Sequence, residues 1–408
     1  MQKFFITIFI VTMQPFLAYS SAFSTTARIC YYNERDYVRA KKACLEAIKI
    51  EPNNFELYGI LSGSEIGLGN WQAASAALIE AINIDSLKTL TWIDKKGGGV
   101  QYFHQAFYFS AQELFYKQNY TQVLSNLAYA TLLIPDDIGT QILSGVTLYK
   151  LGNFDEANKE FRKVLDRDPE NPDVLFLIGK SLFEAKNYDA SLSYFANAEK
   201  YYDLRYARIA QMIFQNRAEI DKALAQRIIM LWAGKKMNEL DSLLKEDLKF
   251  DKGLDVHKVN IEQYYKTAID LARNLYFNGM AYYYLHGDSL ALNKLRQSLE
   301  LTPGDLDALF FTGELLTKFK NYHEARGYFE KLTQLKADDL NAWFYLGVCY
   351  TQLKEYNKAV DVYENKVLPL DPENIGALTN LTYVYNELGN KEKVIKYSEQ
   401  LEKIKKEK

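Results

Sequence analysis

Histidine and cysteine, the residues that most often carry chemistry in proteins, are few in this sequence and are not grouped. The four histidines and three cysteines share no spacing typical of metal ligands, and neither an HExxH nor a CxxC motif is present. The histidines are His104, His257, His286 and His323. We therefore predict no metal site.

Glycine-rich stretches are the second place to look for chemistry, because backbone amides in such loops can hold phosphates. No Lys-Ser or Lys-Thr pair follows Gly63, Gly67 and Gly69, and none follows the glycine run 97–99. The sequence also lacks the GxSxG motif of a serine nucleophile. These observations predict a protein that is not an enzyme and that uses no cofactor.

The elements of the chain follow from an internal repeat. Residues 340–374 hold two amphipathic helical patterns, joined by a polar turn and closed by a proline. The same pattern recurs with a period of about 34 residues, which indicates a repeat architecture. Copies begin at Ser21, Phe55, His104, Ile138, Pro172, Ala272, Leu306, Leu340 and Ile375, and a weaker copy begins at Asp221.

Four positions recur within the copies. The eighth is often glycine, which costs about 1 kcal/mol relative to alanine inside a helix and therefore predicts a close helix contact. The twentieth is often alanine, the seventeenth is often aromatic, and a proline follows the second helix, where the helix must end. The glycines are Gly145, Gly179, Gly279, Gly313 and Gly347; the alanines are Ala40, Ala74, Ala157, Ala291, Ala325 and Ala359; the aromatics are Tyr37, Trp71, Tyr120, Phe154, Tyr188, Tyr322 and Tyr356; the prolines are Pro52, Pro135, Pro169, Pro303 and Pro372.

At these positions the sequence resembles the tetratricopeptide repeat family, and the resemblance covers most of the chain. It implies an all-α fold, a right-handed superhelical solenoid of about nine to ten helix-turn-helix repeats. The pattern is broken at several places. Ser86, Asp203 and Ala337 replace the proline, Leu370 follows a one-residue insertion, and the copy from Asp221 keeps few of the family's residues.

We predict four parts in the chain. Residues 1–22 form a signal peptide, 23–205 a block of five repeats, 206–271 an irregular helical junction with the degenerate copy, and 272–408 a block of four repeats. The first block contains an insertion, 87–103, which the sequence leaves open as a short hairpin or an unstructured connector. The charged segment Asp247–Val259 is predicted to be a loop.

The N-terminal segment has the layout of a secretory signal peptide. Lys3 precedes an apolar run that reaches Leu17, and small residues follow at Ala18, Ser20 and Ala22. The apolar run is shorter than the ~20 residues that span a bilayer. We therefore expect an exported protein, located in the periplasm or cell envelope of a bacterium or otherwise in a secretory pathway, without a membrane span after removal of the signal. An uncleaved anchor and a buried first helix are the alternatives.

Two cysteines lie in the first copy. In an exported protein Cys30 and Cys44 could pair and fasten the N-terminal end of the solenoid. The alternative is that Cys44 fills the core position that Leu78, Phe161 and Phe195 occupy in other copies. Both interpretations stay open.

The charge balance argues against nucleic acid as a partner. The formal net charge is −3 and the charged fraction is 25 %, whereas a nucleic-acid-binding protein needs a basic face. We therefore expect protein partners.

The resemblance also implies where a partner binds, because in this family the first helices line a concave groove with their second, fifth, sixth, ninth and twelfth positions. Here these positions are mostly apolar, and Lys180 and Arg273 provide no cationic clamp for an acidic C-terminus. The groove candidates include Tyr108, Phe109, Phe176, Leu177, Lys180, Tyr276, Phe277, Phe310, Phe311, Phe344 and Tyr345, with Ile142 and Leu143 in the fourth copy. Such a groove favours an extended or helical apolar segment of another protein.

Three other interpretations of these residues are open. Aromatic residues at helical spacing often belong to the core and not to a binding site. Tyrosines also stack on sugar rings, which suggests a carbohydrate-binding or polysaccharide-export scaffold. A third alternative is an accessory subunit of an enzyme that self-associates through its ends.

Overall fold

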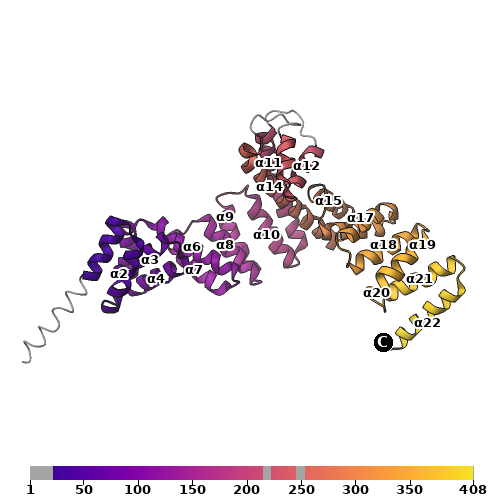
Figure 1. Ribbon diagram of the computed structural model, residues 1–408, viewed down its shortest axis with the longest axis horizontal. Coiled ribbons are helices and arrows are strands. Elements are labelled where there is room, and N and C mark those ends of the chain that lie inside the picture. Colours follow the sequence, from indigo (N-terminus) through magenta and orange to yellow (C-terminus); the bar gives the residue numbers. More distant parts are fainter. Residues whose placement is uncertain (1–21, 215–221, 245–252, 408) are drawn as a thin grey trace, which may run out of the picture. The chain divides into compact units, whose positions relative to one another are not determined.

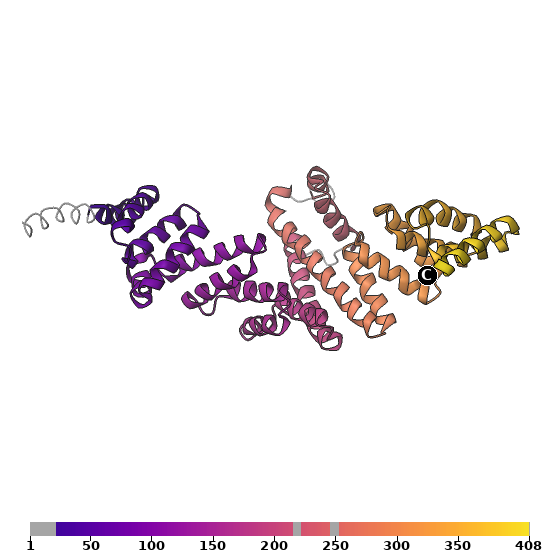
Figure 2. The same cartoon turned by 90° about the horizontal axis from the view of Figure 1, so that it is seen from below.

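The computed structural model describes residues 22–214, 222–244 and 253–407, and every regular element in these ranges is a helix. The predicted signal peptide lies outside the described residues except for Ala22, which begins a helical segment that ends at Arg28. The all-α solenoid that the repeat predicts is confirmed (Figures 1 and 2).

The described residues form two compact units, which divide after Pro169. The first contains η1 (Ile29–Glu34), α2 (Tyr37–Ile50), α3 (Phe55–Gly67), α4 (Trp71–Ile84), α5 (Ser86–Trp92), η2 (Ile93–Gly97), α6 (Val100–Tyr116), α7 (Tyr120–Leu133), α8 (Ile138–Lys150) and α9 (Phe154–Leu165). The second contains α10 (Pro172–Glu184), α11 (Tyr188–Phe214), α12 (Lys222–Ala233), α13 (Met237–Ser242), α14 (Gly253–Tyr284), α15 (Asp288–Leu301), α16 (Leu306–Lys318), α17 (Tyr322–Leu335), α18 (Leu340–Gln352), α19 (Tyr356–Val362), η4 (Tyr363–Val367), α20 (Leu368–Leu370), α21 (Ile375–Glu387) and α22 (Lys391–Glu407).

The helix boundaries confirm the register of the repeat. Six first helices begin at the predicted residue, and in seven copies the aromatic at the seventeenth position is the first residue of the second helix. The first helices are α3, α8, α10, α16, α18 and α21; the second helices are α2, α4, α7, α9, α11, α17 and α19. Helices also end two residues before Pro52, Pro135, Pro303 and Pro372, as proline requires.

The turn between the two helices has a signal that the sequence reading missed. An asparagine commonly precedes the second helix; the Asn119 and Asn321 side chains accept hydrogen bonds from the backbone amides of Gln122 and Glu324. Such caps satisfy amides that would otherwise lack a partner at a helix start. The residue before the asparagine has a positive φ, 58° at Gln118 and 59° at Lys320.

Each glycine at the eighth position lies against a large side chain of the second helix of its own repeat. A β-carbon at Gly145 would lie 2.3 Å from the Phe161 ring, and one at Gly347 would lie 2.5 Å from the Tyr363 ring. The same contact joins Gly179 to Phe195 and Gly313 to Phe329, while Gly279 faces Leu295. These large residues are fully buried, so the glycine permits the close approach that the sequence predicts.

The insertion between α4 and α6 is helical, so both interpretations given above, the hairpin and the unstructured connector, are wrong. Thr89 donates a hydrogen bond to the Ala81 carbonyl at 2.8 Å, and the Trp92 indole N–H donates to the Tyr32 hydroxyl at 2.8 Å. Trp92 also packs on Gly59 of α3. These contacts with neighbouring helices stabilise a seven-residue helix that would be unstable alone.

The region around α14 also differs from its prediction. The boundaries predicted at residues 205 and 271 fall inside α11 and α14. Residues 253–259 of the predicted loop form the first turns of α14. The rest of that predicted loop, 247–252, lies outside the described residues. In Figure 1, α12 lies near α11 and α14. The helix α14 continues through the predicted boundary because it packs against two different elements. Ile261 and Tyr264 pack with the hairpin α12–α13, and the Asn274 side chain donates to the Phe195 carbonyl of α11 at 2.9 Å.

The single extra residue of the eighth copy is absorbed by a π-helix. The segment η4 widens the second helix by this residue and still leaves Tyr363 on Gly347. The neighbouring Glu364 carboxylate accepts hydrogen bonds from the hydroxyls of Tyr385 and Tyr397 in the last repeat. The π-helix therefore preserves the contacts on both sides of the insertion.

We expect Gly347→Leu to lower the free energy of unfolding by ~1–3 kcal/mol or more, because the new side chain would overlap the Tyr363 ring. Gly327→Leu is the matched control, since a β-carbon there meets no atom within 4 Å and leucine favours the helix. Denaturant unfolding of both variants measures the difference. Equal losses of stability would contradict the assigned role of Gly347.

Candidate functional site

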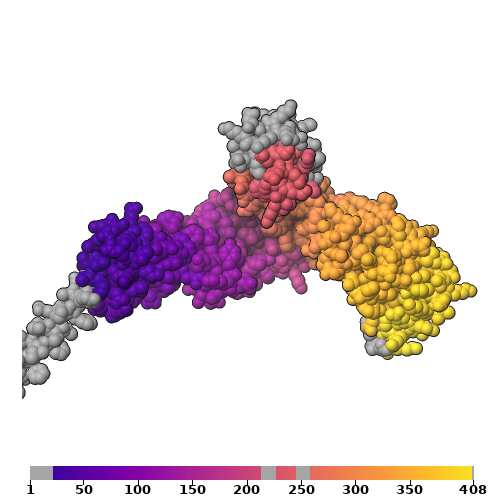
Figure 3. Space-filling view, viewed as in Figure 1, coloured from indigo at the N-terminus to yellow at the C-terminus, as the bar shows by residue number. Residues whose placement is uncertain are grey.

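The predicted groove residues are half-buried rather than fully exposed. This holds for Tyr108, Phe109, Leu177, Lys180, Tyr276, Phe277, Phe310, Phe311, Phe344 and Tyr345, whereas Phe176 is buried. The rings of five of these residues pack against the core of the second unit and stay partly accessible to solvent: Tyr276, Phe310, Phe311, Phe344 and Tyr345. Figure 3 shows that side chains fill the spaces between the ribbons of each unit.

A row of aromatic rings crosses three successive first helices, α14, α16 and α18. The ring of Tyr283 meets that of Phe311 edge-on at 5.4 Å between centroids. The ring of Phe310 meets that of Tyr345 in the same way at 5.6 Å. We call Tyr276, Tyr283, Phe310, Phe311, Phe344 and Tyr345 the aromatic row. Edge-to-face pairs of this kind hold each ring in one orientation.

A carboxylate links the two ends of the row. The Tyr283 hydroxyl donates to one oxygen of Glu314 at 3.1 Å, and the Tyr345 hydroxyl donates to the other at 3.3 Å. Burial, together with the charge of Glu314, raises the pKa of Tyr283 to about 12 and also raises the pKa of Tyr345. Both hydroxyls therefore remain protonated donors at neutral pH, and the rings lie in fixed positions.

Rings at the fifth position of a copy also contact the next copy. A β-carbon at Gly376 would lie 2.7 Å from the Phe344 ring, and one at Gly139 would lie 3.1 Å from the Tyr108 hydroxyl oxygen. The fifth-position aromatics thus help to stack consecutive first helices. This is the structural role that the sequence left open, and it explains why the rings are only partly exposed.

The cationic residues of the predicted groove are engaged by their neighbours. The Lys180 ammonium lies 5.1 Å from the centroid of the Phe277 ring, and Arg273 pairs with Asp270 at 3.3 Å. Sequence reasoning missed two further rings, Tyr188 and Tyr284, which stack on each other at 4.8 Å. Both contact the ring of Phe183, which meets the Phe277 ring at 5.4 Å. The sequence predicts Tyr188 only as the aromatic residue at the start of a second helix. Tyr284 is the thirteenth residue of its copy, one position beyond the last predicted groove position.

In residues 22–169 the candidates Tyr108 and Phe109 are separate from the aromatic row. Tyr108 stacks on the buried His104 ring, and Phe109 lies 4.7 Å from the Trp71 ring. Burial lowers the pKa of His104, whose Nε2 is 2.9 Å from the Thr140 hydroxyl. These contacts are those of a packed interior.

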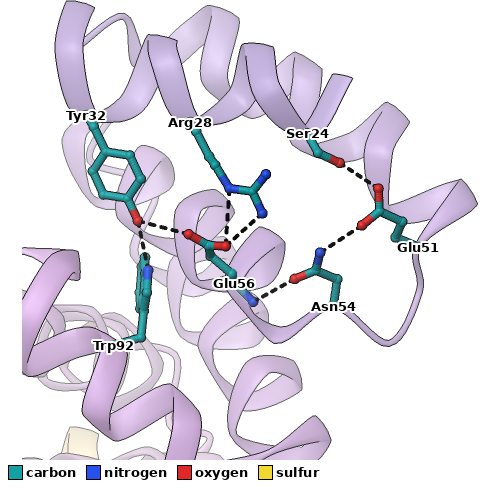
Figure 4. Close-up of polar contacts among 7 residues, drawn as sticks. All are labelled: Ser24, Arg28, Tyr32, Glu51, Asn54, Glu56 and Trp92. Atoms are coloured by element: carbon teal, nitrogen blue, oxygen red, sulfur yellow. Dashed lines mark hydrogen bonds and ion pairs between the residues drawn. The ribbon is translucent and has the colours of Figure 1, made fainter. Parts of the chain in front are cut away.

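The first repeat is fastened by a polar network that has no counterpart in the sequence prediction (Figure 4). Arg28 donates to the Glu56 carboxylate at 2.8 Å, and the Tyr32 hydroxyl donates to the same carboxylate at 3.4 Å. Ser24 and Asn54 both donate to Glu51. The network ties the first helical segment to the start of α3 and, through the Trp92 indole, to the insertion.

Cys30 and Cys44 are free, fully buried thiols in the structure. Burial raises the pKa of Cys44 to about 12 and raises that of Cys30, so neither is a reactive thiolate at neutral pH. Cys349 is likewise free and buried.

Two features are absent from the described residues. No group of three or more histidine, cysteine, aspartate or glutamate side chains is arranged to hold a metal ion within 22–214, 222–244 and 253–407. In the same ranges, none of the helices combines the length and apolar character needed to cross a membrane.

The structure defines the class of protein to which the chain belongs: helical-repeat proteins built from stacked antiparallel helix pairs. Residues 143–202 match the family described as Tetratricopeptide repeat, and residues 262–366 match the family described as Anaphase-promoting complex, cyclosome, subunit 3. With the confirmed register, these matches identify the chain as a tetratricopeptide-repeat protein. Such repeats generally act as scaffolds for protein–protein interaction.

Three solved structures are similar to this chain at low sequence identity. The PilF protein of Pseudomonas aeruginosa is 14% identical, with a TM-score of 0.45, and the match covers 68% of this chain and 95% of PilF. YrrB, described as a TPR protein with an unusual peptide-binding site, is 16% identical, with a TM-score of 0.41, and the match covers 62% of this chain and 96% of YrrB. MamA of Desulfovibrio magneticus is 16% identical, with a TM-score of 0.33, over 45% of this chain and 97% of MamA. No curated protein matches the sequence.

We expect Phe310→Ala to lower the free energy of unfolding by roughly 2–4 kcal/mol, near the cost of removing a core phenylalanine, because its ring contacts Phe329 and Tyr345. Phe319→Ala, at an exposed ring at the end of α16, is the control and should cost less than about 1 kcal/mol. Thermal and denaturant unfolding measure both. A loss at Phe310 no larger than at Phe319 would show that the row is not part of the packing.

Proposed function

We propose that this protein is a non-catalytic scaffold or adaptor that binds an extended or helical apolar segment of a partner protein on the aromatic row. The observation that carries the proposal is the continuity of partly exposed rings across α14, α16 and α18. Contiguous apolar surface on a soluble protein often marks an interaction site.

The fixation of these rings favours binding. A partner that docks on flexible side chains must immobilise them, at a cost of roughly 0.5–1.5 kcal/mol for each. Here edge-to-face contacts and the two hydrogen bonds to Glu314 already restrict the rings. The aromatic row is therefore preorganised, as binding hot spots commonly are.

The character of the surface indicates the character of the partner. Glu314 accepts from both tyrosine hydroxyls, and Lys180 and Arg273 are engaged with neighbouring groups. An acidic terminus would find no cationic clamp among these residues. Apolar side chains of a partner would meet ring edges and accessible ring surface.

We also propose that the protein is exported. The support is the residue pattern Lys3, apolar run to Leu17, and small residues at 18, 20 and 22. A described helix begins at Ala22, so cleavage after Ser20 or Ala22 would leave the first repeat nearly whole.

The partner surface can be located by photocrosslinking in cells. A photoreactive phenylalanine analogue at position 311 should crosslink to a partner protein, whereas the same analogue at the exposed position 335 of α17 should not. Phe311→Ala with Tyr345→Ala should then weaken binding of the isolated partner by about 2 kcal/mol or more. Added salt should change the affinity little, because the contact is apolar.

Two outcomes would contradict this proposal. Equal crosslinking from positions 311 and 335 would remove the assigned surface. A double variant that melts early yet binds normally once folded would show that the row serves packing alone. Binding of soluble glycans that the double variant loses would support the carbohydrate-binding alternative instead.

For export, mass spectrometry of the protein from its native cell should give a chain that begins at Ser21 or Phe23. A lysine substitution in the middle of the apolar run, such as Ile10→Lys, should block processing, and Gln2→Asn should leave it unchanged. A mature chain that retains Met1 would overturn the proposal.

A further inference from the structure

The insertion 87–103 forms two neighbouring cavities in residues 22–169. The larger, of about 380 Å³, is lined by α3 and α5 and by the lysines of η2. The smaller, of about 230 Å³, is walled by Tyr31, Tyr32, Tyr37 and Tyr102. Lys96 lines both cavities. We call the larger cavity the insertion pocket.

The backbone that presents the lysines is held firmly. The Tyr31 hydroxyl donates to the Gly97 carbonyl at 2.8 Å, and the Tyr102 hydroxyl donates to the Gly63 carbonyl at 2.8 Å. Ile93, the first residue of η2, is fully buried. Single-turn π-helices such as η2 occur frequently at functional sites, and this one positions Lys95 and Lys96 in solvent.

The cations of this region form no ion pair with a described residue, although η2 also carries the exposed Asp94, the residue before Lys95. No acidic side chain among the described residues pairs with Arg35, Lys95 or Lys96, all three of which are exposed. The carboxylate in the wall, Glu56, is paired with Arg28, and Lys88 is paired with Asp85 at 2.8 Å. An incoming anionic group would therefore meet cations that form no ion pair among the described residues.

Three of the residues that line the insertion pocket are apolar. Phe55 and Trp92 contribute ring surface, and Leu87, which is 77% exposed, stands at the edge. Covering a leucine this exposed with a ligand is favourable, because apolar surface is removed from water. The pocket thus combines an apolar contact surface with adjacent positive charge.

We propose that the insertion pocket binds a short acidic peptide segment that carries a large apolar residue. Lys95 and Lys96 pair with carboxylates of the peptide, and Phe55, Leu87 and Trp92 contact its apolar side chain. The concave form favours a peptide over a lipid surface, because a flat membrane cannot reach the base of a cavity. This site is separate from the aromatic row and does not depend on it.

The test uses the full chain and a fluorescent probe peptide, Glu-Glu-Phe-Glu-Glu, blocked at both termini. Fluorescence anisotropy should show binding that Lys95→Glu with Lys96→Glu weakens by at least about tenfold, as expected for loss of charge-assisted contacts. Leu87→Ala should weaken it by about threefold or more through lost apolar contact. The matched control, Lys150→Glu with Lys159→Glu, makes the same charge change at exposed lysines elsewhere in the unit and should have little effect.

Further arms keep the proposal testable on the unmodified protein. A peptide with Gln for each Glu, and one with Ala for Phe, should both bind more weakly than the probe. Equal binding of the Gln peptide, an equal loss in the two lysine double variants, or no binding of the probe would overturn the proposal. Preference for phosphatidylglycerol vesicles over the probe would overturn it in favour of a membrane surface. The double variant Phe311→Ala, Tyr345→Ala should retain probe binding, which separates this site from the proposed function.

Discussion

The contact between a glycine of the first helix and a large ring of the second is the interaction on which the repeats depend. At Gly145, Gly313 and Gly347 even one added carbon would lie well inside van der Waals contact with the ring. The helix backbone itself is therefore one wall of the ring's pocket. Because protein interiors are close-packed, this wall sets the separation of the two helices. The separation in turn determines where the fifth- and sixth-position side chains lie against the next repeat.

The N-terminal end of the chain uses the same interaction with different partners. Helix α3 has Ser62 at the eighth position, and its glycines occur instead at residues 59, 63 and 67, one turn apart. These three glycines lie against the rings of Trp92, Tyr31 and Tyr37. Two of the rings come from the first repeat and one from the insertion. A single helix thus joins the beginning of the solenoid to the segment that interrupts it.

Much of this fold is predictable from sequence because each copy of the repeat can be checked against the others. Nine copies in one register place the helix starts, and the starts at Phe55 and Tyr356 agree with the structure. The insertion was not predictable in this way, since it occurs once and its helix is stabilised by residues such as Ala81 and Tyr32 that are distant in sequence. The continuity of α14 was missed because glycine and charge at its start suggested a loop, and tertiary contacts decide such cases.

The candidate site was predictable only in composition. The pairs of apolar residues at the fifth and sixth positions could be read from the sequence. Their exposure could not, because it depends on whether the next repeat offers a small residue such as Gly376 for a ring to cover. The hydrogen bonds from Tyr283 and Tyr345 to Glu314 join three different repeats, and no spacing within one repeat indicates them.

The length of α14 has a mechanical consequence. This helix has 32 residues and is therefore about 48 Å long. Its first half packs with the hairpin α12–α13, and its last turns carry Tyr276 and Tyr283. An uninterrupted helix transmits displacement along its axis, as rigid elements do in coupled proteins. The hairpin and the aromatic rings are therefore joined by one continuous rigid element, so a displacement of the hairpin along the axis of α14 would displace Tyr276 and Tyr283 as well.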